Sequence, residues 1–431
     1  MTIRRHYWLY ISLTIGLLLA PISLATGVRA EGVASAGAHT TSMPASTPSA
    51  PAAQVEQGET VINARSCDFD AVFAAVGMAR SGDTVFIPAG NCNWDERQLD
   101  VPGNVHLRGA GREVTTIRRL GKVANSRYVI AFDCSRGGAV RFSGISLIGN
   151  GNGEIQDKGL GLLHGCRDFA VSNSGFKNFI FGAVYVGDSE TQRGVIFDND
   201  FIDNYSAALG NLGYGVVVYG GGTWPELSLG TQNAVFVEDN YFSGNRHNIA
   251  SNNGSVYVFR HNTVIGLEPA KDFAMTDAHG LSSSQRGSRS YEIYDNHYSV
   301  KLAHGLQRTA IGIRGGDGVI FNNVVNDTIS RAVELSAEGF TCGSYPGQDQ
   351  IRSLYIWNNA YQSIGVHADN GIDNECPSSI QLGRDYFLGV KPGYLPYAYP
   401  HPLRATLATQ AIVSGSLSRH GNVYQLPGDS H

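Results

Sequence analysis

The sequence predicts an all-β solenoid of stacked strands, and three observations support this fold class. First, a phrase made of an apolar run, an asparagine and a further apolar residue recurs along the chain. Second, its repeats are roughly 20 to 40 residues apart, a spacing typical of solenoids with variable loops. Third, only 16% of the residues are charged while 53 of 431 are glycine, which favours short strands with tight turns over a helical bundle. The repeated asparagines are Asn199, Asn240, Asn262, Asn296, Asn323 and Asn359.

The N-terminal residues predict export. Residues 1–30 have the pattern of a signal peptide, with Arg4 and Arg5 before an apolar stretch and Val28-Arg29-Ala30 as a small-residue cleavage site. An uncleaved membrane anchor is the alternative, because the apolar stretch is near the length that spans a bilayer. Residues 31–57 are rich in Ala, Ser, Thr and Pro and predict a disordered linker. We therefore expect a secreted, periplasmic or cell-surface protein with no membrane span after signal removal.

Charge and cysteine content restrict the partners and the compartment. The chain carries 37 acidic and 32 basic residues, a balance that does not suggest nucleic-acid binding. The six cysteines include no Cys-x-x-Cys pair, so a zinc knuckle is not expected. In an exported protein the cysteines should form disulfides. Among the possible connectivities we predict pairing of sequence neighbours: Cys67–Cys92, Cys134–Cys166 and Cys342–Cys376.

Residues 68–80 predict a helix ahead of the first strands. Apolar residues recur there at helical spacing, and Gly82-Asp83 ends the segment before a strand and turn over residues 84–90. A helix at this position would cover the open end of a solenoid, as terminal repeats must do. The apolar positions are Phe69, Val72, Phe73, Val76 and Met78.

The order of these elements resembles the N-terminal part of the pectin lyase-like superfamily. The helix is followed by Gly-Asp-Thr-Val-Phe-Ile-Pro-Ala-Gly at residues 82–90 and by Val-His-Leu-Arg-Gly-Ala-Gly at residues 105–111. The resemblance extends over about residues 60–390 and implies a right-handed parallel β-helix with an N-terminal capping helix. It implies a carbohydrate-active protein without fixing the chemistry, because the superfamily includes lyases, hydrolases, epimerases, esterases and phage tailspikes.

This resemblance sets the expected domain organisation. We place the β-helix domain at residues 58–391 and expect a monomer. Residues 392–431 lack the repeat and are predicted to pack along the outside of the β-helix or to cap its end. The repeated asparagines are expected to be structural, because Asn tolerates left-handed backbone and stacked Asn side chains can bond along the solenoid axis.

A second set of strands lies between the asparagine phrases and is expected to form one sheet. Its first two members are apolar, whereas the next three carry Arg246-His247, Asp277 with His279, and Arg314. Because neighbouring strands lie about 4.8 Å apart, three successive strands place these groups within roughly 10 Å of one another. The segments are 182–188, 215–220, 246–251, 276–281, 310–315 and 331–336.

Side-chain alternation predicts which residues of the first and third charged strands face solvent. With Ile249 in the core, Arg246 and Asn248 face outward, and His247 faces inward or lies at a corner. Arg314 also faces outward, because the isoleucines before it alternate into the core.

The middle strand allows two registers. Asp277 and His279 face outward if the small Ala278 and Gly280 face the core, and inward in the other register. We favour the outward arrangement, because two ionisable groups in a narrow core are costly unless they are paired.

The segment 246–314 is basic within an acidic protein. It contains eight Lys/Arg, five Asp/Glu and five of the 13 histidines, which favours an anionic ligand. We therefore expect an anionic polysaccharide as the partner. Trp224 could stack on a sugar or, equally, anchor its own loop. The residues predicted to bind substrate are Asn248, Arg286, Arg289 and Trp224.

These residues predict a polysaccharide lyase as the first interpretation. In β-elimination a base removes the proton beside a uronate carboxylate, and a cation neutralises that carboxylate. His279, held by Asp277, suits the base because histidine titrates near neutral pH. Arg246 and Arg314 suit the carboxylate, which guanidinium binds in a bidentate manner. His247 belongs either to this catalytic group or to a buried position bonded to the backbone.

A glycoside hydrolase is the second interpretation. Such an enzyme needs two carboxylates across the scissile bond. Asp277 is one candidate, and Asp317, Asp272 or Glu334 would have to supply the other. A third interpretation, from a different class, is a non-catalytic glycan-binding or cell-surface protein.

A metal site is a further alternative. His247, Asp277 and His279 have the ligand types of a divalent metal site. Calcium would prefer a carboxylate cluster, and the sequence shows no strong one. The sequence therefore requires no cofactor, and calcium or another divalent metal stays an open alternative.

Overall fold

The structure describes one folded unit of the chain. The computed structural model describes residues 60–121, 127–151, 157–208, 211–266, 273–282, 285–300, 307–326, 329–338, 342–343, 345–361 and 371–405. The predicted signal peptide and linker lie outside these residues, as does the tail beyond residue 405. The described residues belong to one compact unit. Within the described ranges, no helix is both long enough and apolar enough to cross a bilayer.

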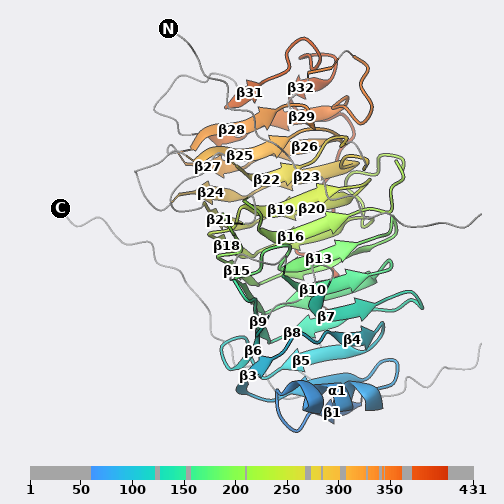
Figure 1. Ribbon diagram of the computed structural model, residues 1–431. Coiled ribbons are helices and arrows are strands. Elements are labelled where there is room, and N and C mark those ends of the chain that lie inside the picture. Colours follow the sequence, from blue (N-terminus) through green and yellow to red (C-terminus); the bar gives the residue numbers. More distant parts are fainter. Residues whose placement is uncertain are drawn as a thin grey trace, which may run out of the picture. The chain divides into compact units, whose positions relative to one another are not determined.

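Three parallel sheets, here called A, B and C, make up this unit (Figure 1). From β2 onward the chain visits the sheets in turn, so that strands consecutive in sequence lie in different sheets. Each visit to A, B and C forms one turn of a right-handed coil. The predicted right-handed parallel β-helix is therefore confirmed.

The strands of each sheet are given in their spatial order. Sheet A contains β1 (Val61–Asn63), β2 (Thr84–Ile87), β5 (His106–Gly109), β8 (Arg141–Ser143), β11 (Arg167–Ser172), β14 (Arg193–Phe197), β17 (Val235–Glu238), β20 (Val256–Arg260), β23 (Ser290–Tyr294), β26 (Asp317–Phe321), β29 (Leu354–Trp357) and β32 (Tyr386–Leu388). Sheet B contains β3 (Gly90–Trp94), β6 (Thr115–Arg119), β9 (Ser146–Ile148), β12 (Gly175–Lys177), β15 (Asp200–Ile202), β18 (Tyr241–Ser243), β21 (Thr263–Ile265), β24 (His297–Ser299), β27 (Val324–Val325) and β30 (Ala360–Tyr361). Sheet C contains β4 (Leu99–Pro102), β7 (Tyr128–Asp133), β10 (Lys158–Leu163), β13 (Val184–Gly187), β16 (Tyr214–Tyr219), β19 (His247–Asn252), β22 (Ala274–Ala278), β25 (Gln307–Ile313), β28 (Ile329–Leu335) and β31 (Ile372–Asn374).

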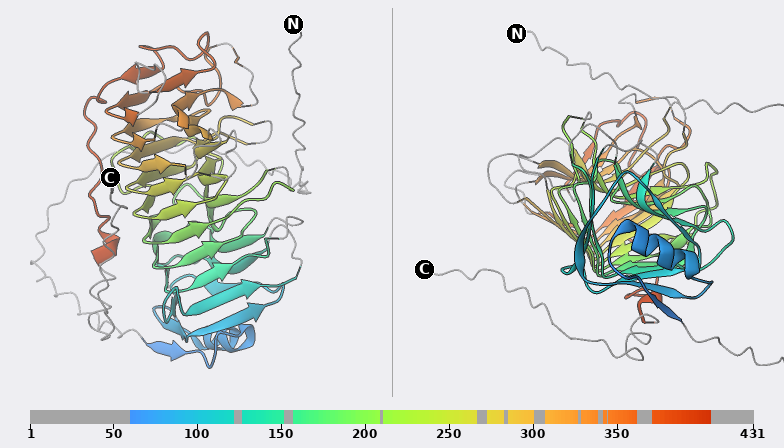
Figure 2. Two further views of the ribbon diagram at one scale, coloured as in Figure 1. Left: turned by 90° about the vertical axis from the view of Figure 1, so that its left-hand side faces the viewer. Right: turned by 60° about the horizontal axis from the view of Figure 1, so that its bottom comes forward.

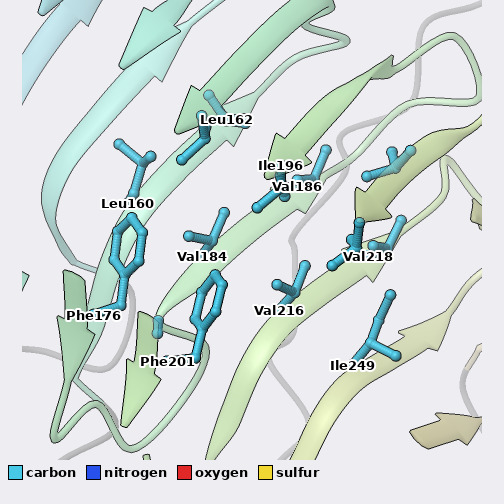
Figure 3. Close-up of a cluster of buried hydrophobic side chains, with 14 of the residues drawn as sticks. Leu160, Leu162, Phe176, Val184, Val186, Ile196, Phe201, Val216, Val218 and Ile249 are labelled. Atoms are coloured by element: carbon cyan, nitrogen blue, oxygen red, sulfur yellow. The ribbon is translucent and has the colours of Figure 1, made fainter. Parts of the chain in front are cut away.

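Inward side chains form columns along the axis of the β-helix. Leu160, Val184, Val216 and Ile249 occupy equivalent positions on four successive strands of sheet C and are fully buried. Figure 3 shows this column beside neighbouring valines and phenylalanines. Complete burial of such a side chain is worth about 1.5–3 kcal/mol. The columns fix the register of sheet C, and with it the positions on its outer face.

The predicted asparagine ladder is present. From Asn199 to Asn359 each side-chain amide donates to the side-chain oxygen of the next ladder asparagine, with N···O distances between 2.9 and 3.1 Å. The left-handed backbone lies one residue earlier than expected, as at Asp239 (φ 54°) and His261 (φ 54°). The ladder asparagines are therefore selected for their amide bonds and not for their own backbone conformation.

The helix and the disulfides match the sequence predictions. Helix α1 (Phe69–Met78) covers the N-terminal end of the β-helix (Figure 2). Phe69, Val72 and Val76 are buried, whereas Phe73 and Met78 are exposed. The predicted cysteine pairing is confirmed in full, as Cys67–Cys92, Cys134–Cys166 and Cys342–Cys376.

The described part of the tail, up to residue 405, lies along the outer face of sheet A (Figure 2). The hydroxyl of Tyr394 donates to Glu292 on β23. Arg260 on β20 donates to the carbonyl oxygens of residues 397 and 398, at 2.7 and 2.8 Å. Glu238 on β17 accepts from the backbone N–H of His401 at 2.9 Å. The segment thus runs lengthwise along the β-helix and crosses several of its turns.

Candidate active site

The register of sheet C places Asp277 on the outer face. Ile249, Thr276 and Ile311 are paired across β19, β22 and β25, and all three are buried in the interior. Because side chains alternate along a strand, Asp277 points the other way. It is nevertheless only 2% exposed, since neighbouring side chains on the outer face cover it.

Three side chains from adjacent strands surround the Asp277 carboxylate. Arg314, which follows β25, contacts both oxygens, with Nε 3.2 Å from Oδ1 and Nη2 2.6 Å from Oδ2. His279, which follows β22, places Nε2 2.7 Å from Oδ2. Nε2 of His247 lies 3.7 Å from the same oxygen. The stacking of strands therefore brings together groups that are far apart in sequence.

Glu338 completes this cluster, although the sequence analysis did not single it out. Its Oε1 lies 2.7 Å from Nη1 of Arg314, and its Oε2 lies 3.6 Å from Nδ1 of His279. Oε2 also accepts the backbone N–H of Gly280 at 3.2 Å. Glu338 comes three residues after the end of β28, just beyond the last strand segment that the sequence suggested. His279 and Arg314 come directly after their strands, and the equivalent position after β28 is Ser336, so the strand register alone does not point to Glu338.

The charges of the cluster are strongly coupled. Burial alone would raise the pKa of Asp277, but the charge of Arg314 and the neighbouring imidazoles outweigh it. The pKa of this carboxyl is thereby held well below its usual range, and Asp277 is ionised at neutral pH. An ionised carboxylate accepts hydrogen bonds only, so Nε2 of His279 donates to it.

His279 is the group of the cluster that reaches solvent most. Its side chain is 24% exposed, compared with 3% for Asp277, 18% for Arg314 and 19% for Glu338. Because Nε2 donates to Asp277, neutral His279 carries its lone pair on Nδ1. The cluster therefore presents one oriented imidazole with a proton-accepting nitrogen away from its buried carboxylate.

His247 and Arg246 border the cluster on the β19 side. Nδ1 of His247 lies 2.5 Å from the carbonyl oxygen of Ala274 and so donates to it. Burial, reinforced by the charge of Arg246, lowers the pKa of His247 to about 3. Arg246 lies over the rings of Tyr214 and Phe273 and donates to the Tyr214 hydroxyl at 2.8 Å. In the part of the chain that the structure describes, Nε of Arg246 has no hydrogen-bond partner.

The predicted outward orientation of Asn248, near the start of β19, needs correction. His247 lies on the outer side, with its ring stacked on Tyr214 at 5.5 Å between centroids. Asn248 is 1% exposed, and its side chain bonds to Asn245 and to the carbonyl oxygen of Met275 inside the β-helix. The strand turns a corner here, so Asn248 and Ile249 both face the interior. Asn248 therefore belongs to an internal amide ladder and is not accessible to a substrate.

The other residues predicted to bind substrate form a clamp between loops. The Trp224 ring lies between the guanidinium groups of Arg286 and Arg289, at 4.7 and 5.0 Å from its centroid. Arg286 makes a bidentate pair with Asp349, and Arg289 binds Asp317 at 2.9 Å. These contacts correspond to the loop-anchor interpretation of Trp224.

The second carboxylates considered for a hydrolase are engaged elsewhere. Asp317 binds Arg289, and Glu334 accepts from Thr309 at 2.6 Å and from Arg331 at 2.8 Å. Asp272 lies outside the described residues. Neither Asp317 nor Glu334 therefore belongs to the cluster around Asp277.

The donor set does not suit a metal ion. In the described ranges no three His, Cys, Asp or Glu side chains are grouped so that they could hold one. His247, Asp277 and His279 do lie close together, but the Arg314 guanidinium occupies both oxygens of the carboxylate. A guanidinium at this position repels a cation, so these residues do not fit the metal site considered above.

Comparisons with known proteins bear on the fold. The sequence matches no family model and no curated protein. Similar solved structures include a GH87 alpha-1,3-glucanase of Streptomyces thermodiastaticus, with 13% identity over 81% of this chain and 71% of the other, at a TM-score of 0.42. The A-module of the Azotobacter vinelandii mannuronan C-5 epimerase AlgE4 has 15% identity over 77% and 94%, also at 0.42. A family 28 exopolygalacturonase of Yersinia enterocolitica has 12% identity over 78% and 79%, at 0.31.

The fold itself is a parallel β-helix. Proteins of this fold carry several activities, so the fold alone assigns none. The parallel β-helix explains how the cluster is built, because it stacks short strands in register and places side chains at the outward positions and strand ends close together. The functional argument therefore depends on the geometry around Asp277.

Proposed function

We propose that the protein is an exported enzyme that cleaves a uronate-containing polysaccharide by β-elimination, with His279 as the base. The observation that carries the proposal is the oriented imidazole: His279 is partly exposed, and its Nε2 is held 2.7 Å from a buried, ionised carboxylate. A carboxylate that fixes the tautomer and orientation of a histidine base is a recurrent catalytic arrangement. The three disulfides support export to an oxidising compartment.

The proposed reaction uses Nδ1 of His279, which lies 3.6 Å from Oε2 of Glu338, beyond hydrogen-bond distance. Nδ1 takes the proton from the sugar carbon beside the uronate carboxylate. The electron pair left on that carbon forms a carbon–carbon double bond, and the bond to the glycosidic oxygen breaks. The leaving oxygen takes up a proton from water. Asp277 stabilises the imidazolium that forms and is a positioning residue, because it is buried beneath the cluster.

The two arginines have different roles in this proposal. All three nitrogens of Arg314 contact Asp277 or Glu338, so Arg314 positions the carboxylates and does not receive the substrate. Arg246 is half-buried and lies against two aromatic rings, and its guanidinium donates to the Tyr214 hydroxyl and to no carboxylate of the described residues, so a substrate carboxylate could pair with its exposed edge. We therefore assign the neutralising cation to Arg246.

The hydrolase is the second candidate, because Asp277 and Glu338 are two carboxylates in one cluster. A hydrolase would need the glycosidic oxygen or a water between them. In the structure the Arg314 guanidinium and the His279 imidazole bridge the two carboxylates instead. Asp277 is also held ionised, which does not suit a general acid.

Substitution of His279 tests the proposal. We expect wild-type protein to generate the ultraviolet absorbance of unsaturated uronates from at least one uronate polymer, and His279→Ala to reduce the rate at least about 100-fold. The matched control is His164→Ala, because His164 is an exposed histidine that also binds an aspartate, Asp133, at 2.8 Å. Equal loss in both variants, or no absorbance across a broad panel of uronate polymers, would contradict it. Binding without any turnover would favour the non-catalytic glycan-binding interpretation.

A further inference from the structure

A second cation on the outer face of sheet C is held by aromatic rings. Nζ of Lys158, the first residue of β10, lies 5.0 Å from the ring centroids of Tyr128 and Phe181 and 5.5 Å from that of Tyr185. Burial lowers the pKa of Lys158, and the one acid that influences it is Asp188. Among the residues that the structure describes, none forms an ion pair with Lys158. Its charge is therefore compensated by ring faces and not by a carboxylate.

Lys158 and Arg246 share this environment. Arg246 lies 4.8 Å from the Phe273 centroid and 5.5 Å from that of Tyr214, again without a carboxylate partner in the described part of the chain. Phe181, which contacts Lys158, packs edge-on against Tyr214, which contacts Arg246, at 5.7 Å. The two cations are thus joined by a continuous aromatic surface. Near such apolar groups an anion interacts with a cation more strongly than it does in water.

The strand register places the two cations in line with the cluster. Lys158 begins β10, and Tyr214 and His247 are paired at the equivalent positions of β16 and β19. Three strand-to-strand steps separate β10 from β19, as Figure 1 shows, so Lys158 and Arg246 are about 14 Å apart along the axis. A short oligosaccharide laid along the outer face would span this distance.

The opposite side of the cluster has the opposite charge. Arg331 on β28 binds three carboxylates, Glu334 at 2.8 Å, Asp373 at 2.7 Å and Glu375 at 3.3 Å. One guanidinium does not neutralise both Glu334 and Asp373, so among the described residues this part of sheet C is acidic. It would repel a carboxylated sugar, whereas the β10–β19 side would attract one.

We propose that Lys158 and Arg246 are two carboxylate-binding points for an acidic polysaccharide, so that its uronate residues lie over β10 to β19 on one side of His279. The inference rests on the proposed function for the location of the bond that is cleaved. It adds a direction to substrate binding: the acidic sugars extend from the cluster towards α1, and the sugars over β28 and β31 are uncharged or absent. Lys158 becomes a specificity-determining residue remote from the reacting atoms.

Binding measurements on an inactive full-length chain test this proposal. Galacturonate and mannuronate oligosaccharides of increasing length are titrated calorimetrically into His279→Ala, with and without Lys158→Gln. We expect Lys158→Gln to weaken binding of the longer acidic oligosaccharides about tenfold and to flatten its salt dependence, with no effect on the shortest ones. The matched control is Lys177→Gln on β12 of sheet B, whose lysine is half exposed and pairs with Asp203 at 3.7 Å.

The outcomes separate the two proposals. Equal affinities for Lys158→Gln and Lys177→Gln, with both variants folded by circular dichroism, would overturn the proposal that Lys158 binds a substrate carboxylate, even if the wild-type protein is a lyase. Failure of every acidic oligosaccharide to bind would overturn it as well. If binding depends on Lys158 but the wild-type protein forms no unsaturated products, the carboxylate-binding points are supported and the proposed lyase activity is contradicted. For an active enzyme, Lys158→Gln should raise KM for long polymers and leave kcat unchanged.

Discussion

Asp277 shows how one residue can organise a site without touching the substrate. Its carboxylate is almost fully buried and binds Arg314, His279 and, at longer range, His247. Removing one partner of such a buried ion pair costs about 3–5 kcal/mol, because it leaves the other charge uncompensated. His279 is the residue of the cluster that is most exposed to solvent, and its contact with Asp277 fixes its orientation.

The buried His247 makes stability depend on pH. In the folded state it stays neutral down to about pH 3, whereas in the unfolded chain it takes up a proton below about pH 6.5. Between these values the unfolded state binds more protons, so stability rises with pH. The groups facing it are Arg246, Asp277 and His279; the lowered pKa of Asp277 adds a loss in the same direction only below about pH 4.

Urea unfolding between pH 5 and pH 6.5 measures this contribution. We expect His247→Gln to reduce the slope of unfolding free energy against pH by up to about 1.4 kcal/mol per pH unit, the value for one proton. The slope of the wild-type protein over the same pH range is the reference. An unchanged slope in His247→Gln would show that His247 is not the neutral buried group described here.

At the scale of elements, one buried aspartate joins the two loops that carry His279 and Arg314. The Asp349 side chain accepts from Arg286 and from the backbone N–H of Gly287 at 2.9 Å, just before Ser288 donates its N–H to the carbonyl oxygen of His279. The Asp349 carbonyl accepts from Gly316, two residues after Arg314. The strands fix where each loop begins, and the contacts of Asp349 fix the position of the loop residues that follow His279 and Arg314.

Replacing Asp349 tests whether this connection positions the site. Asp349→Asn keeps the shape but removes the charge, and we expect it to cost about 1–3 kcal/mol of stability and to lower kcat with little change in KM. Asp70→Asn is the control, because Asp70 pairs with Arg97 on the exposed surface near α1. A fall in stability with unchanged kcat would limit Asp349 to a structural role.

The sequence predicted those elements whose signals are local or repeated. The asparagine ladder, the capping helix and the three disulfides all follow from spacing along the chain. Asn248 was misplaced because a corner interrupts the alternation of β19, and corners have no periodic signal. Glu338 was missed because it lies in a loop beyond β28. Glu338 binds the one nitrogen of Arg314 that does not contact Asp277, so the sequence did not reveal that Arg314 is fully engaged within the cluster. Contacts between loops of different turns require the fold itself.

At the scale of the whole unit, the C-terminal segment protects the outer face of sheet A. Arg260 and Glu238 are fully buried, and the tail supplies them with the carbonyl oxygens of Tyr397 and Ala398 and with Arg404. Apolar residues of sheet A lie beneath the same segment, including Phe236 and Phe321. In a β-helix the inner face of each sheet is buried and the outer face is open, and this segment covers the outer face of sheet A.

Truncation tests this role. A chain ending at residue 390 loses the charged hydrogen bonds to Arg260 and Glu238, each worth about 1.5–3 kcal/mol, and we expect its thermal midpoint to fall by several degrees. A chain ending at Ala405 keeps the described contacts and serves as the control. Equal midpoints for the two chains would show that the tail does not stabilise the unit.

The central claim is that His279 acts as the base of an elimination, and the fate of water tests it most directly. Elimination adds no water to the new chain ends, whereas hydrolysis adds one. Wild-type protein is incubated with a uronate polymer in water labelled with heavy oxygen, and the products are analysed by mass spectrometry. We predict unsaturated oligosaccharides without the label. Saturated products carrying heavy oxygen at their new reducing ends would contradict the claim and assign the cluster to hydrolysis.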